Sequence, residues 1–364
     1  MKNKKIMLVV GARPNFMKMK PVYEALKKYS YLDIRIIHTG QHYDYEMSQV
    51  FFENLCLPRP DIFLNVRSGT HGAQTAKAIE GLEDVFVREH PDLVVVFGDV
   101  NSTLAASISA SKLMIPIAHV EAGLRSFDRT MPEEVNRVVT DVLSSLLFVT
   151  EESGVKNLKN EGIQDSRIYL VGNTMIDTLL RLQKFTNSDK LREFDVKKSE
   201  YTLVTLHRPF NVDDPRRLER IISILDKLGE EHPVLFPIHP RTKKRLEEFN
   251  IRSNGNLKII PPLNYIDFLN LQRYSGLVIT DSGGIQEETT VLGVPCITVR
   301  PNTERPITEE IGTNVVLKER PLEDIIDLGN EVFSGKWKKG RIPELWDGKA
   351  GERIAKVIYK HLLG

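Results

Sequence analysis

The sequence is short of cysteine, of net charge and of long apolar runs, and each shortage excludes a class of protein. Its two cysteines, Cys56 and Cys296, are too few for a disulfide framework or a multi-cysteine zinc site, and they favour a reducing compartment. The 50 lysines and arginines nearly balance 49 aspartates and glutamates, and this net charge of +1 argues against a nucleic-acid surface or a polybasic membrane patch. No stretch approaches the roughly 18 apolar residues that a membrane span needs.

Other signals are absent as well. The apolar run Ile6–Val10 is too short for a signal peptide and ends at Gly11 without a cleavage-like site, so we expect a first strand and a cytoplasmic protein. The turn after this run lacks Gly-x-Gly-x-x-Gly spacing, which weakens a NAD or FAD hypothesis. No metal-ligand spacing and no Gly-x-Ser-x-Gly elbow occurs. The chain of 364 residues, 41% hydrophobic and 27% charged, is typical of a globular enzyme of about two domains.

Short apolar runs alternate with helical patterns along almost the whole chain. The runs are rich in Val, Ile and Leu, which is typical of strands covered on both faces. They are Lys5–Gly11, Asp33–Gly40, Leu93–Asp99, Ile115–Ala122, Leu146–Thr150, Ile168–Gly172, Tyr201–His207, Val234–His239, Leu257–Pro261, Leu277–Asp281 and Cys296–Val299. Helices are predicted over Pro21–Ser30, Ala73–His90, Ser102–Leu113 and Pro132–Ser145. This alternation predicts an α/β fold of two Rossmann-like domains with parallel sheets.

One polar stretch interrupts the alternation. Arg181–Glu200 is rich in Lys, Asp, Asn and Ser and is interpreted as a linker. We therefore predict an N-terminal Rossmann-like domain over residues 1–180 and a C-terminal one over residues 181–349. The tail, residues 350–364, has apolar side chains at helical spacing and either ends the second domain or packs back on the first.

Anion-binding groups follow the predicted strands, where open α/β sheets bind their ligands. Arg13 and Lys18 come after the first strand, and Ser282–Gly284 opens a helix whose N–H groups and dipole favour a phosphate. Arg305 can reach the same anion, and an acid such as Glu288 can hold ribose hydroxyls. A nucleoside diphosphate satisfies these groups together, although each segment alone is also compatible with an ordinary turn.

Candidate acid–base groups also stand at strand and helix ends. Asp99 ends one strand, Glu121 lies at the end of the next, and Glu133 is in the first turn of a predicted helix. Carboxylates in a cationic site suit proton removal and return. The structural alternatives are a helix N-cap for Asp99 and charge complementarity with the helix dipole for Glu133. His207 and His239 follow strands of the second half.

Seven segments, in order, resemble the non-hydrolysing UDP-N-acetylglucosamine 2-epimerases along nearly the whole chain. The segments are Gly-Ala-Arg-Pro (11–14), Thr-Gly-Gln-His (39–42), Gly-Asp-Val-Asn-Ser-Thr (98–103), His-Val-Glu-Ala-Gly-Leu-Arg (119–125), Pro-Glu-Glu-Val-Asn-Arg (132–137), Thr-Asp-Ser-Gly-Gly-Ile-Gln-Glu-Glu (280–288) and Thr-Glu-Arg-Pro (303–306). The resemblance implies a GT-B-like pair of domains, with the C-terminal helix, residues 350–364, packed on the first. It also implies reversible conversion of UDP-N-acetylglucosamine to UDP-N-acetylmannosamine through a 2-acetamidoglucal, without a metal or other cofactor.

The resemblance assigns roles to individual residues. The catalytic positions it implies are Asp99, Glu121, Glu133 and His207. The UDP-binding positions are Arg13, Lys18, Phe268, Ser282, Gly283, Gly284, Glu288 and Arg305. A second, activating UDP-N-acetylglucosamine is expected at Gln41, His42, Arg208 and His239. A homodimer is expected, with no nucleic-acid or membrane partner.

Three other functions remain open. A retaining UDP-sugar glycosyltransferase on the same scaffold needs an acceptor channel and one key acid. A hydrolysing epimerase releases free N-acetylmannosamine because water attacks the intermediate. A nucleotide-sugar sensor binds without turnover. Three separate acid candidates favour an epimerase over the glycosyltransferase, and the same intact acids argue against the sensor.

Overall fold

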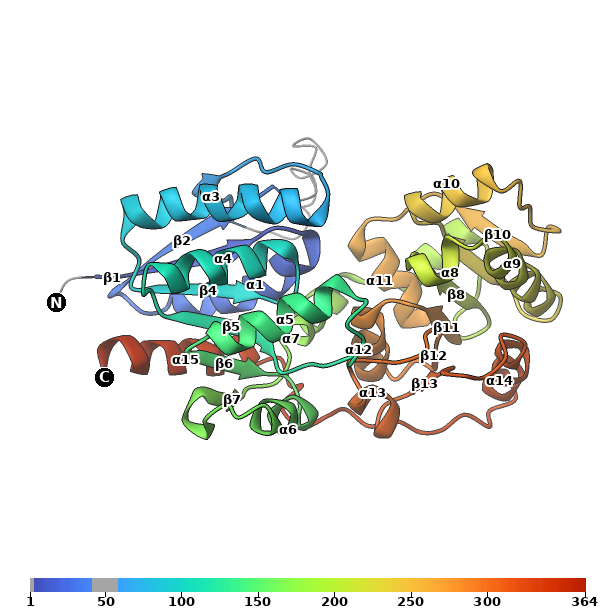
Figure 1. The fold of residues 1–364 in the computed structure, drawn as a ribbon. Coiled ribbons are helices and arrows are strands. Elements are labelled where there is room, and N and C mark those ends of the chain that lie inside the picture. The colour runs from blue at the N-terminus through green and yellow to red at the C-terminus, as the bar shows by residue number, and fades with distance from the viewer. Residues whose placement is uncertain (1–2, 41–57) are drawn as a thin grey trace. The chain divides into compact units, whose positions relative to one another are not determined.

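The computed structural model describes residues 3–40 and 58–364, which form two compact units (Figure 1). Unit 1 comprises Met1–Thr178 and Glu344–Gly364, and unit 2 comprises Leu179–Pro343. Each unit is built on one parallel sheet, which confirms the predicted α/β class with two Rossmann-like sheets. None of the helices in the described ranges is long and apolar enough to cross a membrane.

Unit 1 has a seven-stranded sheet in the order β3-β2-β1-β4-β5-β6-β7. Its strands are β1 (Lys4–Val10), β2 (Leu32–His38), β3 (Ile62–Phe63), β4 (Leu93–Phe97), β5 (Ile117–Ala122), β6 (Leu146–Val149) and β7 (Ile168–Leu170). Its helices are α1 (Arg13–Leu26), α3 (His71–Glu89), α4 (Asn101–Lys112), α5 (Pro132–Leu143), α6 (Glu152–Asn160), η1 (Asp165–Arg167), the first part of α7 (Thr174–Leu182) and α15 (Ala350–Leu363). Alternate residues of β1 and β4 pack against α3 and α4 in one buried cluster.

Unit 2 has a six-stranded sheet in the order β10-β9-β8-β11-β12-β13. Its strands are β8 (Thr202–Thr205), β9 (Val234–Pro237), β10 (Leu257–Ile260), β11 (Leu277–Thr280), β12 (Cys296–Thr298) and β13 (Asn314–Val316). Its helices are η2 (Gln183–Phe185), η3 (Ser188–Phe194), α8 (Pro209–Val212), α9 (Pro215–Gly229), α10 (Pro240–Glu248), α11 (Tyr265–Tyr274), α12 (Gly283–Leu292), α13 (Ile307–Glu310) and α14 (Asp324–Phe333). One face of the sheet packs against α9 and α14, and the other against α11.

Helix α1 begins eight residues earlier than the predicted Pro21–Ser30, because Pro21 lies inside the helix rather than at its start. A proline in a helix leaves the carbonyl four residues before it without its usual donor. Here the Thr178 hydroxyl donates to the Met17 carbonyl at 2.7 Å and takes that place. Helix α15 packs directly on this turn, since a Cβ added at Gly351 would lie 2.6 Å from Pro21 backbone atoms.

The segment predicted to be a linker is structured. It contains the end of α7 and the 3₁₀ helices η2 and η3. Leu191 is buried in the core cluster that includes Tyr201, and Asn187 N–H donates to Asn270 Oδ1 at 2.7 Å. The polar composition of the segment reflects its solvent-facing residues, and its few apolar side chains anchor it to unit 2.

Candidate active site

Glu121 and Lys18 form a buried ion pair at the carboxyl edge of the unit 1 sheet. Each residue is 7% exposed, and Lys18 Nζ contacts Glu121 Oε2. Asn15 fixes the start of α1 beside this edge, since its Oδ1 accepts from Ala12 N–H at 3.0 Å and its Nδ2 donates to the Phe97 carbonyl at 2.7 Å. The ion pair offsets part of the cost of burying both charges.

The backbone at Glu121 is strained. Its φ is +75°, a left-handed conformation that is unfavourable for a residue with a side chain, and the β5–β6 register shifts between Val120 and Ala122. The bulge changes the direction of the Glu121 side chain relative to a regular strand. Such strain persists only where the surroundings hold it, and it gathers at functional sites.

Gly98 leaves room for this ion pair. It has φ of +64°, and a Cβ there would lie 2.8 Å from Lys18 Nζ and 3.3 Å from Glu121 Oε2. Any larger residue would therefore push the two charged groups apart. The close approach requires glycine both for space and for its backbone conformation.

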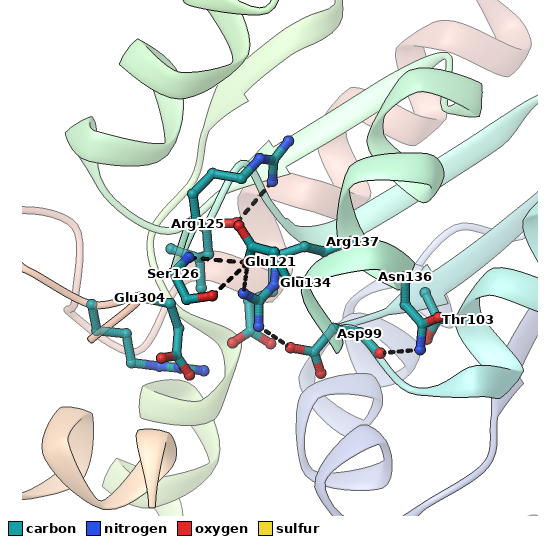
Figure 2. A network of polar contacts seen from close by, with 12 residues as sticks. Asp99, Thr103, Glu121, Arg125, Ser126, Glu134, Asn136, Arg137 and Glu304 are labelled. Atoms are coloured by element: carbon teal, nitrogen blue, oxygen red, sulfur yellow. Dashed lines mark hydrogen bonds and ion pairs between the residues drawn. The ribbon is translucent and has the colours of Figure 1, made fainter. Parts of the chain in front are cut away.

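Asp99 is an ion-pair partner and not a helix cap, which was the structural alternative to an acid–base role. The N-cap residue of α4 is Val100, without a side-chain cap, whereas Asp99 Oδ2 accepts from Arg137 Nη2. Arg137 also donates to Glu134, so it links two carboxylates (Figure 2). Asn136 Nδ2 donates to the Asp99 carbonyl at 2.8 Å and fixes the backbone of the same residue.

Glu134 and its neighbour Glu133 differ in their surroundings. Glu134 is 3% exposed, and its oxygens accept from Ser126 N–H at 3.0 Å, Ser126 Oγ at 2.9 Å and Phe127 N–H at 2.9 Å (Figure 2). Glu133, the predicted acid, is half-buried in the first turn of α5.

Arg13, one of the predicted diphosphate ligands, is exposed and is the first residue of α1.

In unit 2, the predicted phosphate loop lies at the N-terminus of α12. Ser282 is the N-cap residue but makes no side-chain cap, and a Cβ at Gly284 would meet nothing within 4 Å. A Cβ at Gly283 would lie 2.4 Å from Arg305 Nη1, so the guanidinium sits directly against the turn. Arg305 also donates to two buried carboxylates, Glu287 at 2.7 Å and Glu304 at 2.5 Å.

Glu288 is held farther along α12 in a fully buried position. Tyr265 Oη donates to Glu288 Oε1 at 2.7 Å. Burial raises the pKa of Glu288 to about 7, although the Tyr265 hydrogen bond acts in the opposite direction. Phe268, predicted to bind UDP, is half-buried on α11. It packs against the core cluster on that face of the unit 2 sheet.

Asp281 organises the loop that carries His207. Its carboxylate accepts from His207 N–H at 3.0 Å, Arg208 N–H at 2.9 Å and Asn211 Nδ2 at 3.0 Å. Burial alone would raise the pKa of Asp281, but His207, Asn211 and the Arg208 N–H together lower it. The buried charge therefore fixes the loop backbone through N–H donors.

The residues predicted for a second ligand are only partly described. Gln41 and His42 lie outside the described residues. His239 is close to His207, with ring centroids 5.1 Å apart. Burial, reinforced by His207, lowers the pKa of His239 to about 4, so this ring is neutral near pH 7.

The structure brings Lys18, Glu121 and Asp99 to one edge of unit 1, together with residues that the sequence analysis did not identify. These are Asn15, Glu134, Asn136 and Arg137. The spacing of Glu134 and Arg137, one helical turn apart beside Asp99, was the signal available for the pair. Asp281, the residue before Ser282, had no such signal because its partners in residues 207–211 are 70 to 74 residues away in the sequence.

Comparisons with known proteins agree on one family. The family model for UDP-N-acetylglucosamine 2-epimerase matches residues 24–359. A UDP-N-acetylglucosamine 2-epimerase of Methanocaldococcus jannaschii is 46% identical, covering 97% of this chain and 98% of that protein. A UDP-2,3-diacetamido-2,3-dideoxy-D-glucuronate 2-epimerase of Pseudomonas aeruginosa is 40% identical, covering 98% and 99%. The crystal structure of the M. jannaschii enzyme with UDP-GlcNAc and UDP matches with a TM-score of 0.88 at 45% identity, covering 98% of this chain and 99% of that one.

Proposed function

The chain belongs to the UDP-N-acetylglucosamine 2-epimerase family, and we propose that it interconverts UDP-N-acetylglucosamine and UDP-N-acetylmannosamine without hydrolysis. The observation that carries the proposal is the buried Lys18–Glu121 pair on a strained strand end, beside the Asp99–Arg137 pair. Buried charges and a strained backbone both cost free energy, and they are typical of proton-transfer sites.

The chemistry requires carboxylates and a well-held leaving group. The C2–H of the sugar has no adjacent carbonyl, so it becomes acidic only as the C1–O bond to UDP breaks and C1 gains positive charge. UDP leaves with the bonding electron pair, a carboxylate takes the C2 proton, and a C1–C2 double bond forms. A second acid then delivers a proton to the opposite face of C2 while a UDP oxygen rejoins C1.

In unit 1, Asp99, Glu121 and Glu133 supply the acid–base groups in this proposal. Lys18 holds the Glu121 carboxylate, and Arg137 holds that of Asp99. General acid–base groups of this kind contribute about 10²–10⁴-fold each. Arg13, at the first turn of α1, supplies charge for the diphosphate.

In unit 2, the N-terminus of α12 holds the diphosphate through Ser282, Gly283 and Gly284, with Arg305 against the turn. Glu288 binds the ribose hydroxyls, and Phe268 lies near the uracil. His207, on the loop fixed by Asp281, contacts the reacting group or the diphosphate. Retention of UDP beside the glycal supplies the rest of the rate advantage.

The proposal includes regulation by substrate and a homodimer, both supported by the family resemblance. In this proposal a second UDP-N-acetylglucosamine contacts Arg208 and His239 of unit 2; Gln41 and His42, expected with them, lie outside the described residues. It activates only if it binds the active conformation more tightly than the inactive one. The reverse reaction from UDP-N-acetylmannosamine alone should then start slowly and accelerate after a trace of UDP-N-acetylglucosamine, and His239→Ala should remove the acceleration.

The deciding experiment is proton NMR of UDP-N-acetylglucosamine with the protein in heavy water. The epimerase places deuterium at C2 of both UDP-sugars. Release of free N-acetylmannosamine indicates the hydrolysing reaction, and binding without exchange indicates a sensor or a glycosyltransferase that awaits an acceptor. UDP-2,3-diacetamido-2,3-dideoxy-D-glucuronate, offered in parallel, tests the other substrate known in the family. Exchange on that compound alone would reject the assignment of substrate.

A further inference from the structure

His119 lies two residues before Glu121 on β5 and is fully buried. Its Nδ1 is 2.6 Å from Asp141 Oδ1, and its Nε2 is 2.8 Å from the Gly98 carbonyl oxygen. Each ring nitrogen therefore faces an acceptor, and a carbonyl oxygen cannot donate. Nε2 therefore carries a proton and donates to the Gly98 carbonyl, while Nδ1 pairs with the Asp141 carboxyl group.

Asp141, on α5, uses its other oxygen for the backbone. Its Oδ2 accepts from Gly123 N–H at 3.1 Å and is 2.7 Å from Arg125 Nη2. Burial alone would raise the pKa of Asp141, but His119 and Arg125 lower it below its ordinary value. Arg125 is in turn held by Glu161, with Nε and Nη2 donating at 2.7 and 2.6 Å.

This ion pair holds the backbone on both sides of the candidate acids. The Gly98 carbonyl belongs to the peptide bond that leads into Asp99, and Gly123 follows Glu121 by two residues. Asp141 contacts the chain at His119 and at Gly123. The bulge in which Glu121 has φ of +75° lies between these two positions. A strained conformation of this kind needs surroundings that fix it from more than one direction.

We propose that the His119–Asp141 ion pair is a positioning element for the proton-transfer step, and that it sets the geometry of the Asp99 and Glu121 carboxylates together. The inference rests on the proposed epimerase function. Neither residue contacts substrate in this proposal, because both are fully buried and act through the backbone. A misplacement of about 1 Å in a reacting group can cost on the order of 100-fold in rate.

The test compares Asp141→Asn with a matched control, Asp177→Asn. Asp177 is also a buried unit 1 carboxylate that accepts from backbone N–H groups, those of Ala350 at 3.1 Å and Gly351 at 2.7 Å, but it holds α15 rather than β5. Both variants should lower the melting temperature. Only Asp141→Asn should lower kcat and C2 deuterium exchange, by about 100-fold with KM changed less than about threefold.

Each result has a defined meaning. Equal kcat in the two variants, or a rise in KM at unchanged kcat for Asp141→Asn, overturns the inference. Wild-type protein without C2 exchange refutes the proposed function instead, so the two failures are distinct. If Asp141→Asn does not fold, His119→Gln replaces it in the same comparison, because glutamine cannot donate to both partners.

Discussion

Replacement of two neighbouring glutamates on α5 should separate a scaffold role from a chemical one. Glu134→Gln preserves shape but leaves an amide with one acceptor oxygen. In the wild type, Glu134 Oε2 faces Ser126 N–H, Ser126 Oγ and Arg137, while Oε1 faces Phe127 N–H. In the better of the two amide orientations, the glutamine oxygen still faces the two Ser126 groups and Arg137. Its NH₂ group then faces Phe127 N–H, so two donors point at each other.

The cost follows from these contacts. An unsatisfied buried donor costs about 1–3 kcal/mol, and the loss of charge opposite Arg137 adds about 1 kcal/mol more. We expect Glu134→Gln to lower the stability of unit 1 by about 3 kcal/mol. For a unit of about 200 residues this corresponds to a melting temperature roughly 6–12 °C lower.

Glu133→Gln is the matched control, because Glu133 is adjacent and only half-buried. Circular dichroism should place its melting temperature within about 1 °C of the wild type, as surface changes rarely exceed about 0.5 kcal/mol. Its kcat should fall by at least about 100-fold if the residue is an acid or base. Full activity of Glu133→Gln would remove it from the mechanism. Similar melting temperatures for the two variants would refute the scaffold assignment of Glu134.

Three more outcomes follow from unit 2 and from the proposed chemistry. Because burial raises the folded-state pKa of Glu288 from 4.5 to about 7, the stability that this group contributes should be fully present below pH 4.5 and fall by roughly 3 kcal/mol as pH rises to 7; the difference in urea stability between the wild type and Glu288→Gln should follow this decline, and Tyr265→Phe should extend the decline to higher pH. Asp281→Asn should lower kcat/KM by at least about 10-fold in steady-state assays, because the amide carries no negative charge and places an NH₂ group where Oδ1 faces the His207 N–H; unchanged kinetics would show that the loop does not depend on this charge. Dialysis against a chelator should leave the C2 exchange rate unchanged, and a loss restored by a divalent cation would contradict the metal-free mechanism.

The sequence predicted most strands, and it placed the starts of three of the four expected helices within two residues. Eleven apolar runs correspond to strands of the two sheets, since parallel strands covered on both faces must be apolar throughout. The short strands β3 and β13, of 2 and 3 residues, were missed. Helix α1 was placed late because Pro21 resembles a helix start, and its compensating partner, Thr178, is remote in sequence.

In the candidate site, too, some residues could be predicted from the sequence and others could not. Strand-end positions located Asp99 and Glu121, because parallel topology brings the carboxyl ends of strands to one edge. The partners of those residues were not predictable from local pattern. Arg137 lies 38 residues from Asp99, and Lys18 lies on α1 whereas Glu121 lies on β5. Only tertiary packing reveals that these charges are paired and which glutamate of α5 is buried.

The return of α15 to unit 1 has a consequence for how the protein is made. Trp346, 1% exposed, donates through Nε1 to the Thr150 carbonyl at 3.0 Å, and Asp177 receives the first N–H groups of α15. Domains generally fold as units during synthesis, N-terminal first. Here the first sheet is translated early, but the segment that covers α1 is translated only after the whole of unit 2. The α1 surface of the nascent chain therefore stays uncovered until the ribosome has passed residue 343. Dependence on chaperones should be concentrated in that interval.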